Sequence, residues 1–504
     1  MQFLLSLPAE THNSPKESSH GAHVEWHTTC CFDGVARPSD TYRRRRPEHS
    51  VLYRVVHDHF ETFRAQSASI RDGGGLPRFV DEEFRSYLRC GWLAAGFARF
   101  RCAACGTDRL VAFSCKGRGF CPSCSARRMA QHTAHLVDHV FPPVAVRQWV
   151  LSLPFRIRYL LAWDHDLARA VVAVFLRTVM GFLRTRARHG GLADGRTGAV
   201  AIVQRFGAAL NLNVHVHALV LDGVFARDGS GRVAFHEATA PSDDDVAAVV
   251  DTIRQRVLRL FERRGHGVDD DGFAPDRWGE EAPVLAGMGA ASVQGRIASG
   301  PRAGAMVRRL GDSPDEVDVD TPRGNGHARR EGFDLHAGVV APAGHRHRLE
   351  RLCRYALRPP IAEERLTLTP DQQVLLRLRH RWTDGTTHLL FDPIELLERL
   401  AVITPRPRIN LILYHGVLPF DFAQGTPSGM AATNCAGARR GADVRRQLHA
   451  RQRVECRRAG WRWQRDRTVG STCPVVGLSD APGVRLRRAL VSALRPDHAV
   501  DCAD

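Results

Sequence analysis

The spacing of the cysteines near residue 110 constrains the fold more than any other feature of the sequence. Cys102 and Cys105 form one Cys-x2-Cys pair, and Cys121 and Cys124 form a second pair after the 15 residues 106–120. Two thiolate pairs at this spacing suit one tetrahedral zinc ion held on two tight turns. We therefore predict a structural zinc site with these four ligands, and because its shell is full, the site does not activate water.

Cys90 and Cys115 lie close to these pairs in the sequence and are alternative ligands, but we interpret them as neighbours that do not bind the ion. The chain has 13 cysteines, an odd number, and five of them lie between residues 102 and 124. Such clustering favours a metal site in a reducing compartment over a framework of disulfides.

The chain is strongly basic, with 71 Lys and Arg residues against 54 Asp and Glu residues and an isoelectric point of about 9.9. A positive field at neutral pH makes a polyanion the expected partner, although net charge alone does not identify it. Arginines stand on both sides of the second cysteine pair. We expect Arg118, Arg127 and Arg128 to contact phosphates, because guanidinium groups bind them at little cost to folding.

No segment has the length and composition of a membrane span. The most apolar helical candidate, Val171 to Leu183, contains Arg177 and is shorter than the roughly 20 apolar residues that a bilayer requires. The first residues, Met1 to Ala9, lack the basic start and the length of a secretion signal. We therefore expect a cytoplasmic protein with no membrane partner.

The first part of the chain predicts a leader and a helical domain. Residues 1–47 have no apolar period and predict a flexible leader. From Val51 to about Trp92, apolar residues recur at helical spacing in two segments separated by Gly73 to Gly75. Together with the cysteine pairs, these helices define an expected domain over residues 48–146.

A second domain, with an antiparallel sheet, is expected over residues 147–418. We predict strands at residues 147–161, 199–206, 212–225, 233–236, 366–369, 374–378 and 387–391. We predict helices at residues 166–188, 345–357 and 393–403, and a helix that begins at the N-cap Ser242 and runs to Arg264. The fold class is therefore α+β.

Two stretches do not fit this pattern of elements. Residues 269–332 are rich in Gly, Pro and Asp, and we interpret them as an insertion or linker. Residues 419–504 combine Gly, Arg and Cys without a period, so we expect a poorly ordered tail, for which a shifted reading frame is one explanation.

A histidine pair stands in the segment Asn211-Leu-Asn-Val-His215-Val-His217. Residues two apart in a strand project from the same face, so both imidazoles can bind one metal ion. Such an ion polarises a phosphodiester as a Lewis acid, with Mg²⁺ or Mn²⁺ as the candidates. Gln204 on the preceding strand is our candidate for a third ligand, and a polar residue on the surface of the strand is the alternative.

Two tyrosines follow the histidines, and Tyr355 is the better candidate for a nucleophile that forms a covalent intermediate. It lies in a predicted amphipathic helix, where Arg348 and Arg351 share its flank at helical spacing. Arginines beside the phenol would bind a phosphate and favour the phenolate. Tyr414 lies within the apolar run 409–418, and we expect it to be packed in the core.

Taken together, these segments resemble the rolling-circle insertion-sequence transposases of bacteria, which belong to the His-hydrophobic-His (HUH) class of endonucleases. The resemblance extends from about Val51 to Leu418, and three segments carry it in the order of the family: Phe113-Ser-Cys-Lys-Gly-Arg-Gly-Phe-Cys-Pro-Ser-Cys124, then Val203-Gln-Arg-Phe-Gly207 with Asn211 to His217, and then Cys353-Arg-Tyr-Ala-Leu-Arg-Pro-Pro360.

The resemblance implies an enzyme that nicks and rejoins single-stranded DNA at the ends of a mobile element. In this reading Tyr355 attacks the strand and leaves a 5′-phosphotyrosine and a free 3′-hydroxyl, while His215 and His217 bind the metal. Some relatives have a second tyrosine four residues on, but Pro359 stands there, which implies the single-tyrosine variety. The expected partner is DNA at the nucleoid, and the predicted contacts to DNA come from Arg118, Arg127, Arg128, Arg348, Arg351 and Arg358.

Two other functions share parts of this pattern. A plasmid replication initiator or conjugative relaxase has the same chemistry at a different origin, but the zinc module and the Arg-Pro-Pro motif favour a transposase. A zinc-ribbon regulator that binds DNA without catalysis is the alternative from another class, and it applies if the histidines are only packed in the strand.

Overall fold

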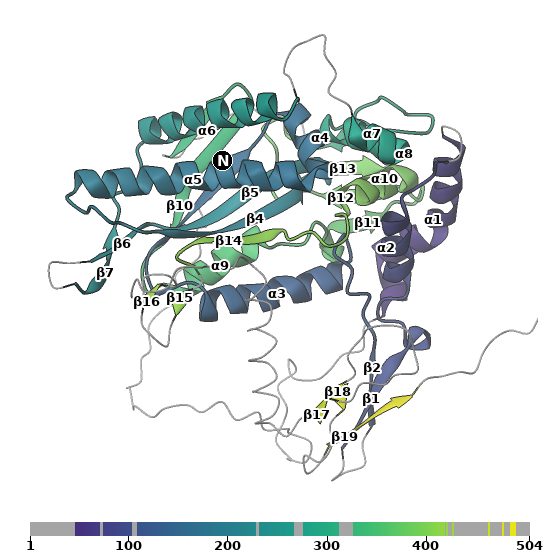
Figure 1. Ribbon diagram of the computed structural model, residues 1–504. Coiled ribbons are helices and arrows are strands. Elements are labelled where there is room, and N and C mark those ends of the chain that lie inside the picture. Colours follow the sequence, from purple (N-terminus) through teal and green to yellow (C-terminus); the bar gives the residue numbers. More distant parts are fainter. Residues whose placement is uncertain are drawn as a thin grey trace, which may run out of the picture. The chain divides into compact units, whose positions relative to one another are not determined.

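The computed structural model describes residues 46–70, 74–102, 108–227, 231–266, 276–311 and 326–418, and five short strands beyond them. The predicted leader, apart from its last two residues, and most of the predicted tail lie outside these residues. The chain divides into two compact units, which we describe separately (Figure 1). The larger includes residues 49–88 and 116–433, and the smaller includes residues 89–115 and 434–504.

A six-stranded antiparallel sheet forms the centre of the larger unit. The strand order is β14-β4-β5-β3-β10-β9, so β5 lies between its neighbours β4 and β3. The prediction of an antiparallel sheet in an α+β domain is therefore confirmed. The strands are β3 (Val146–Ser152), β4 (Gly198–Phe206), β5 (Leu212–Leu221), β9 (His327–Arg330), β10 (Phe333–Ala341) and β14 (Ile412–Gly416).

Helices cover both faces of this sheet, with α5 and α6 on one face and α3 and α9 on the other (Figure 1). Alternate residues of a strand point to opposite faces. Leu219 and Leu221 of β5 are buried in one apolar cluster with Leu136 of α3 and Leu352 of α9. Odd-numbered residues of β5 therefore face α9. The helices are α3 (Pro122–His139), α5 (His165–His189), α6 (Asp243–Arg263) and α9 (Arg346–Ala356).

Side-chain caps fix where the long helices begin. The carboxylate of Asp164 accepts a hydrogen bond from the Leu167 amide at 2.8 Å and caps the N-terminus of α5. Ser242 and Asp245 form a reciprocal capping box at α6, so the predicted N-cap is confirmed. A second capping box, Asp392 with Glu395, precedes α10 (Pro393–Ile403).

The two predicted N-terminal helices are α1 (Val51–Ser69) and α2 (Arg78–Leu88). Their shared core is aromatic: the ring of Phe84 lies 4.8 Å from that of Phe60 and 4.7 Å from that of Phe120, between ring centroids. Ser50 caps α1 by accepting the Tyr53 amide at 3.2 Å. Helix α1 also contacts α10, so both belong to the larger unit.

A four-stranded sheet with the order β11-β12-β13-β8 and a hairpin of β6 with β7 complete the larger unit. The short strands predicted after residue 365 are confirmed. The elements are β6 (Gly223–Arg227), β7 (Val233–Glu237), β8 (Arg308–Leu310), β11 (Leu366–Leu368), β12 (Val374–Arg377) and β13 (His388–Phe391), and β15 (Phe420–Asp421) pairs with β16 (Thr426–Pro427).

The prediction of a single strand over residues 147–161 is wrong in its second half. Strand β3 ends at Ser152, and the helix α4 (Phe155–Trp163) follows. Pro154 explains the change, because a proline has no N–H to donate to the sheet and is tolerated at a helix start. Its carbonyl accepts the first helical hydrogen bond, from the Arg158 amide at 3.0 Å.

The interpretation of residues 269–332 as a linker is also wrong for α7 (Arg277–Glu281) and α8 (Pro283–Val293). Trp278 of α7 stacks on Trp163 of α4, with ring centroids 5.4 Å apart. A Cβ at Gly289 of α8 would lie 2.3 Å from the Trp278 ring, so the glycine is what lets α8 approach. Small residues that signalled a loop in the sequence are thus needed for close packing.

The smaller unit contains a sheet with the order β19-β1-β2 and a two-stranded pairing of β17 with β18. These elements are β1 (Phe97–Cys102), β2 (Asp108–Ala112), β17 (Arg462–Trp463), β18 (Val476–Gly477) and β19 (Val484–Ala489), and η2 (Leu93–Ala95) precedes β1. Within the described residues, no helix combines the length and the apolar character needed to span a bilayer.

Candidate active site and cysteine cluster

Strand β5 places the predicted histidine pair on the sheet face that α9 covers. His215 and His217 are 6% and 2% exposed, and their ring centroids are 4.9 Å apart. The next residues on this face, Leu219 and Leu221, belong to the apolar core. The pair therefore lies at the edge of the apolar core. Burying imidazoles there without hydrogen-bond or metal partners would lower the stability of the fold.

Hydrogen bonding defines the tautomer of His215. Its Nδ1 lies 2.8 Å from the backbone carbonyl of Asn213, and a carbonyl can only accept, so Nδ1 carries the proton and Nε2 keeps its lone pair. Burial lowers the pKa of His215 to about 4, and Arg358 and Arg158 act in the same direction. Burial, followed by His215 and Arg358, also holds the pKa of His217 well below its usual value. Both rings are neutral at pH 7, as a metal ligand requires.

Gln148 of β3, which belongs to no motif recognisable in the sequence, contacts the other histidine. Its amide nitrogen lies 2.9 Å from Nδ1 of His217, and both side chains are buried. Within the described residues, Nε2 of His217 has no hydrogen-bond partner. One nitrogen of this imidazole is thus held by the sheet while the other is directed into the site.

Gln204 links strand β4 to the end of α9. It pairs with His215 across the sheet, and its amide nitrogen donates to the Ala356 carbonyl at 2.5 Å. Its Oε1 is buried and, among the described residues, has no hydrogen-bond partner. A buried acceptor without a partner normally costs about 1–3 kcal/mol. Together with Nε2 of His217, this oxygen makes the site suited to a divalent ion, whose ligands would be nitrogen and oxygen.

Tyr355 reaches the histidines from α9. Its ring lies edge-on to that of His217, with centroids 5.6 Å apart and an angle of 86° between the planes. The side chain is 44% exposed, while Leu352, Cys353 and Ala356 of the same helix face the core. The structure therefore brings together Gln204, the histidine pair and the predicted nucleophile, which come from two strands and a helix far apart in the sequence.

Two arginines stand beside the phenol. The Arg358 guanidinium lies 4.5 Å from the centroid of the Tyr355 ring, and its NH1 is buried without a hydrogen-bond partner among the described residues. Burial, followed by the charge of Arg358, lowers the pKa of Arg379, whereas the charge of Tyr355 acts in the opposite direction. Arg379 is thus an electrostatic neighbour of the tyrosine that sequence reasoning missed, because it lies in a loop outside any recognised motif.

The other predicted arginines divide into two groups. Arg348 and Arg351 are exposed on α9, and Arg127 is exposed on α3. Arg118 instead donates to the Ile409 carbonyl, and Arg128 donates to the Gly117 carbonyl at 2.8 Å. The first three are accessible to a polyanion, whereas the other two already hold backbone carbonyls of the larger unit.

The expectation that Tyr414 is packed in the core is wrong. It lies on β14, the edge strand of the six-stranded sheet, and its side chain is 40% exposed. The apolar run around it indicated burial, but an edge strand has a neighbour on one side only. Partial burial still raises the pKa of its phenol.

A cluster of four cysteines differs from the predicted zinc ligands in two members. The sulfur atoms of Cys90, Cys115, Cys121 and Cys124 all lie within 4.8 Å of one another. The second predicted pair is therefore present, but Cys90 and Cys115, which we had set aside, stand in the place expected for the first pair. Cys105 and the side chain of Cys102 lie outside the described residues. Four thiolates are a complete shell for structural zinc.

Two family models match the chain. Residues 198–424 match a family described as "Putative transposase", and residues 55–153 match the transposase zinc-binding domain of the IS91 type. No curated protein and no solved structure matches the chain. The first range contains the histidine pair and Tyr355, and the second contains the four clustered cysteines. Both matches indicate a transposase, which is an enzyme that processes DNA, and the match to a zinc-binding domain that contains a four-cysteine cluster supports zinc as its ion.

Proposed function

We propose that this chain nicks and rejoins single-stranded DNA through a covalent bond to Tyr355, as an HUH transposase of the single-tyrosine variety. The observation that carries the proposal is the contact of Tyr355 with His217, at 5.6 Å between ring centroids. Two buried side-chain atoms of this site, Nε2 of His217 and Oε1 of Gln204, have no hydrogen-bond partner among the described residues. A regulator without catalysis would not need a phenol next to a neutral imidazole pair. The transposase match over residues 198–424 agrees with this function.

The covalent step is an exchange of one ester for another. The phenol oxygen of Tyr355 bonds to the phosphorus, and the bond from phosphorus to the 3′-oxygen breaks. The 3′-oxygen leaves as a hydroxyl, so the proton lost by the phenol is balanced by the proton gained there. Strand transfer is the reverse reaction with a different 3′-hydroxyl, so no energy source beyond the phosphotyrosine is needed.

A divalent ion, Mg²⁺ or Mn²⁺, fits the donor atoms of His215, His217 and Gln204. When bound it supplies Lewis-acid polarisation of the scissile phosphate. The protein's own contribution is to hold both imidazoles neutral by burial and to direct their lone pairs, with the Asn213 carbonyl fixing one ring and Gln148 contacting the other.

Arginines orient the strand in this proposal. The Arg358 guanidinium over the Tyr355 ring lies where it can bind the scissile phosphate. Arg348 and Arg351 lie about two turns and one turn before the tyrosine on α9 and are exposed, so they can bind the next phosphates of the strand. Arg127 extends the basic surface on α3, and Arg118 and Arg128 contribute charge from positions where they also hold backbone carbonyls.

We further propose that Cys90, Cys115, Cys121 and Cys124 are the zinc ligands, and that the ion is structural. Their sulfur atoms complete the shell, which leaves Cys102 and Cys105 without a place in it. The domain boundary then falls near residue 146, where the zinc-binding region ends and β3 enters the six-stranded sheet.

The test is a covalent-adduct assay with the full chain, Mn²⁺ or Mg²⁺, and a labelled single strand from an end of the element. The unaltered protein should form an adduct that migrates with the protein in denaturing gels. Tyr355→Phe should abolish the adduct, because the ring remains but the nucleophile is lost. Tyr414→Phe is the matched control and should retain it. An adduct with Tyr355→Phe, or its loss only with Tyr414→Phe, would refute the assignment.

A further inference from the structure

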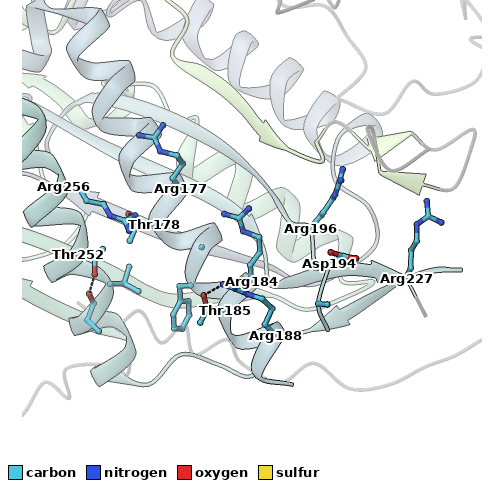
Figure 2. Close-up of a pocket in the computed structure, with 16 residues that line it drawn as sticks. Arg177, Thr178, Arg184, Thr185, Arg188, Asp194, Arg196, Arg227, Thr252 and Arg256 are labelled. Carbon is cyan, nitrogen blue, oxygen red and sulfur yellow. Dashed lines mark hydrogen bonds between the residues drawn. The ribbon is translucent and has the colours of Figure 1, made fainter. Parts of the chain in front are cut away.

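A basic hollow lies on the face of the sheet opposite the tyrosine, between α5, α6 and the turn after α5. It has a volume of ≈1090 Å³ and is lined by six arginines, Arg177, Arg184, Arg188, Arg196, Arg227 and Arg256 (Figure 2). Asp194 is the single carboxylate among its lining residues, so the formal charge of the lining is six minus one, or +5. All six arginines are exposed.

Three of these arginines follow one side of α5. Arg177, Arg184 and Arg188 are separated by seven and four residues, which places all three within an arc of about 40° around the helix. They extend over about 17 Å of helix axis, which equals roughly five steps of a nucleic-acid strand at 3.4 Å each. The helix thus presents a line of positive charge whose length suits several consecutive phosphates.

Among the described residues, none of Arg177, Arg184, Arg188 and Arg256 forms an ion pair with a carboxylate. Their hydrogen bonds go to neutral oxygens: Arg188 donates to the Thr185 hydroxyl at 3.0 Å, and Arg256 donates to the Thr178 hydroxyl at 3.2 Å. A set of exposed arginines gathered in this way raises the local concentration of anions.

Arg186 shows the contrast on the same helix. It lies between Arg184 and Arg188 in the sequence but does not line the hollow, and it pairs with Asp245 of α6 at 3.1 Å. The charge of Arg186 is therefore balanced by a carboxylate of the protein, whereas Arg184 and Arg188 have no ion pair among the described residues.

The hollow offers no surface for stacking bases. Its aromatic lining residue is Phe182, which is half-buried, packs edge-on against Trp149 with centroids 6.2 Å apart, and lies beneath Arg186. Proteins that bind single strands without sequence preference rely on exposed aromatic platforms as well as charge. Arginines and threonine hydroxyls without such a platform suit the backbone of a duplex, whose bases are already stacked.

We infer that this hollow binds the phosphate backbone of double-stranded DNA as a second nucleic-acid site. The biological role of this site rests on the proposed function, because an enzyme that cuts a single strand at an element end must also hold the adjoining duplex. The binding is independent of base sequence and is separated by the thickness of the sheet from the strand held at Tyr355.

The experiment measures the binding of a fluorescent duplex of about 20 base pairs between about 50 and 200 mM NaCl. The variant carries Arg177→Ala, Arg184→Ala and Arg188→Ala together. If each arginine neutralises one phosphate, the slope of log K against log salt becomes shallower by about 2.7. The loss of affinity across this salt range then shrinks by about 40-fold, because each contact accounts for about 3.5-fold.

A matched control removes the same charge elsewhere. Arg64, Arg78 and Arg259 are exposed helical arginines that do not line the hollow, and their triple alanine variant should keep the slope of the unaltered protein. Equal slopes for all three proteins, or an equal loss in both variants, would overturn the inference. A single strand of the same sequence serves as a third arm, and a hollow variant that loses affinity only for the single strand would also refute it.

The adduct assay keeps this inference distinct from the proposed function. The hollow variant should still form the adduct with a short single strand, because Tyr355 and the histidines are untouched. Normal adduct formation with no change in duplex binding would refute the hollow alone. Loss of duplex binding in the variant, when the unaltered protein never forms an adduct, would refute the nuclease and leave the duplex site.

Discussion

Gln148 offers the sharpest test of how the sheet prepares His217 for a metal. Its amide nitrogen faces Nδ1 at 2.9 Å, and the side chain is 3% exposed. If the amide nitrogen donates, the proton of the imidazole is on Nε2 and the ring cannot bind an ion there. Turning the amide by half a turn places its oxygen against an Nδ1–H group and leaves the lone pair of Nε2 free. We predict that metal binding selects this second arrangement.

Two substitutions separate the possibilities. Gln148→Leu removes the hydrogen bond between the Gln148 amide and Nδ1 of His217 and should weaken Mn²⁺ binding by about 10–100-fold, the usual effect of losing such a partner. That range corresponds to about 1.4–2.7 kcal/mol. Gln148→Glu supplies a carboxylate that can only accept from Nδ1–H, so its affinity for Mn²⁺ should equal or exceed that of the unaltered protein.

The assay is a titration of zinc-loaded protein with Mn²⁺, followed by the loss of the free Mn²⁺ signal in electron paramagnetic resonance. Loading with zinc first keeps the cysteine cluster from contributing. The melting temperature of each variant without Mn²⁺ shows whether the fold is intact. An affinity for Gln148→Leu within twofold of the unaltered protein would refute the role of Gln148, and a Gln148→Glu variant as weak as Gln148→Leu would refute the tautomer.

Three further predictions concern stability, zinc and pH. Arg147→Met should lower the free energy of unfolding in urea by about 3–5 kcal/mol, because the buried carboxylate of Asp222 loses the guanidinium that binds its two oxygens at 2.9 and 2.7 Å. Arg147→Met combined with Asp222→Leu should recover most of that stability. A loss of less than about 1 kcal/mol in the single variant would contradict this reasoning. Cys90→Ser should lower the zinc content measured by atomic absorption and Cys102→Ser should not, and the opposite result would restore the ligands expected from the sequence. Burial, followed by nearby arginines, lowers the pKa of His165 to about 4, so the unfolded chain binds this proton near pH 6.5 and the folded chain only near pH 4. The stability contributed by the neutral imidazole is therefore present above pH 6.5 and is lost as the pH falls towards 4. His165→Gln should make the decrease of the urea midpoint over this pH range smaller.

Local patterns in the sequence were sufficient for much of the fold. The cap at Ser242 depends on neighbours within a few residues, and this prediction is confirmed. The shared face of His215 and His217 is equally local, and their ring centroids lie 4.9 Å apart. Residues 155–163 and 283–293, predicted as part of a strand and part of a linker, are helices in the structure because of contacts between distant segments. Their helices are stabilised by contacts such as Trp278 on Trp163, which join segments that the sequence does not show to be neighbours.

The same distinction explains which cysteines were assigned. Cys-x2-Cys is a local signal, and two such pairs predicted four ligands. In the structure, the pair of Cys121 and Cys124 at the start of α3 belongs to the cluster. The other two members, Cys90 and Cys115, are 25 residues apart and form no local motif. Spacing alone favours pairs, whereas the distance between sulfur atoms is decided by how the chain folds back on itself.

The candidate site combines both kinds of information. The histidine spacing predicted a shared face, and the helix pattern predicted that Tyr355 avoids the core, yet neither indicated that the two would meet. What joins them is Gln204, whose amide nitrogen is bound to the carbonyl at the end of α9. That bond fixes the amide nitrogen, and the oxygen of the same amide is buried without a hydrogen-bond partner among the described residues. Gln204 therefore holds the tyrosine helix in place and offers a ligand with the same side chain, which is why a substitution there would affect the position of Tyr355 and metal binding together.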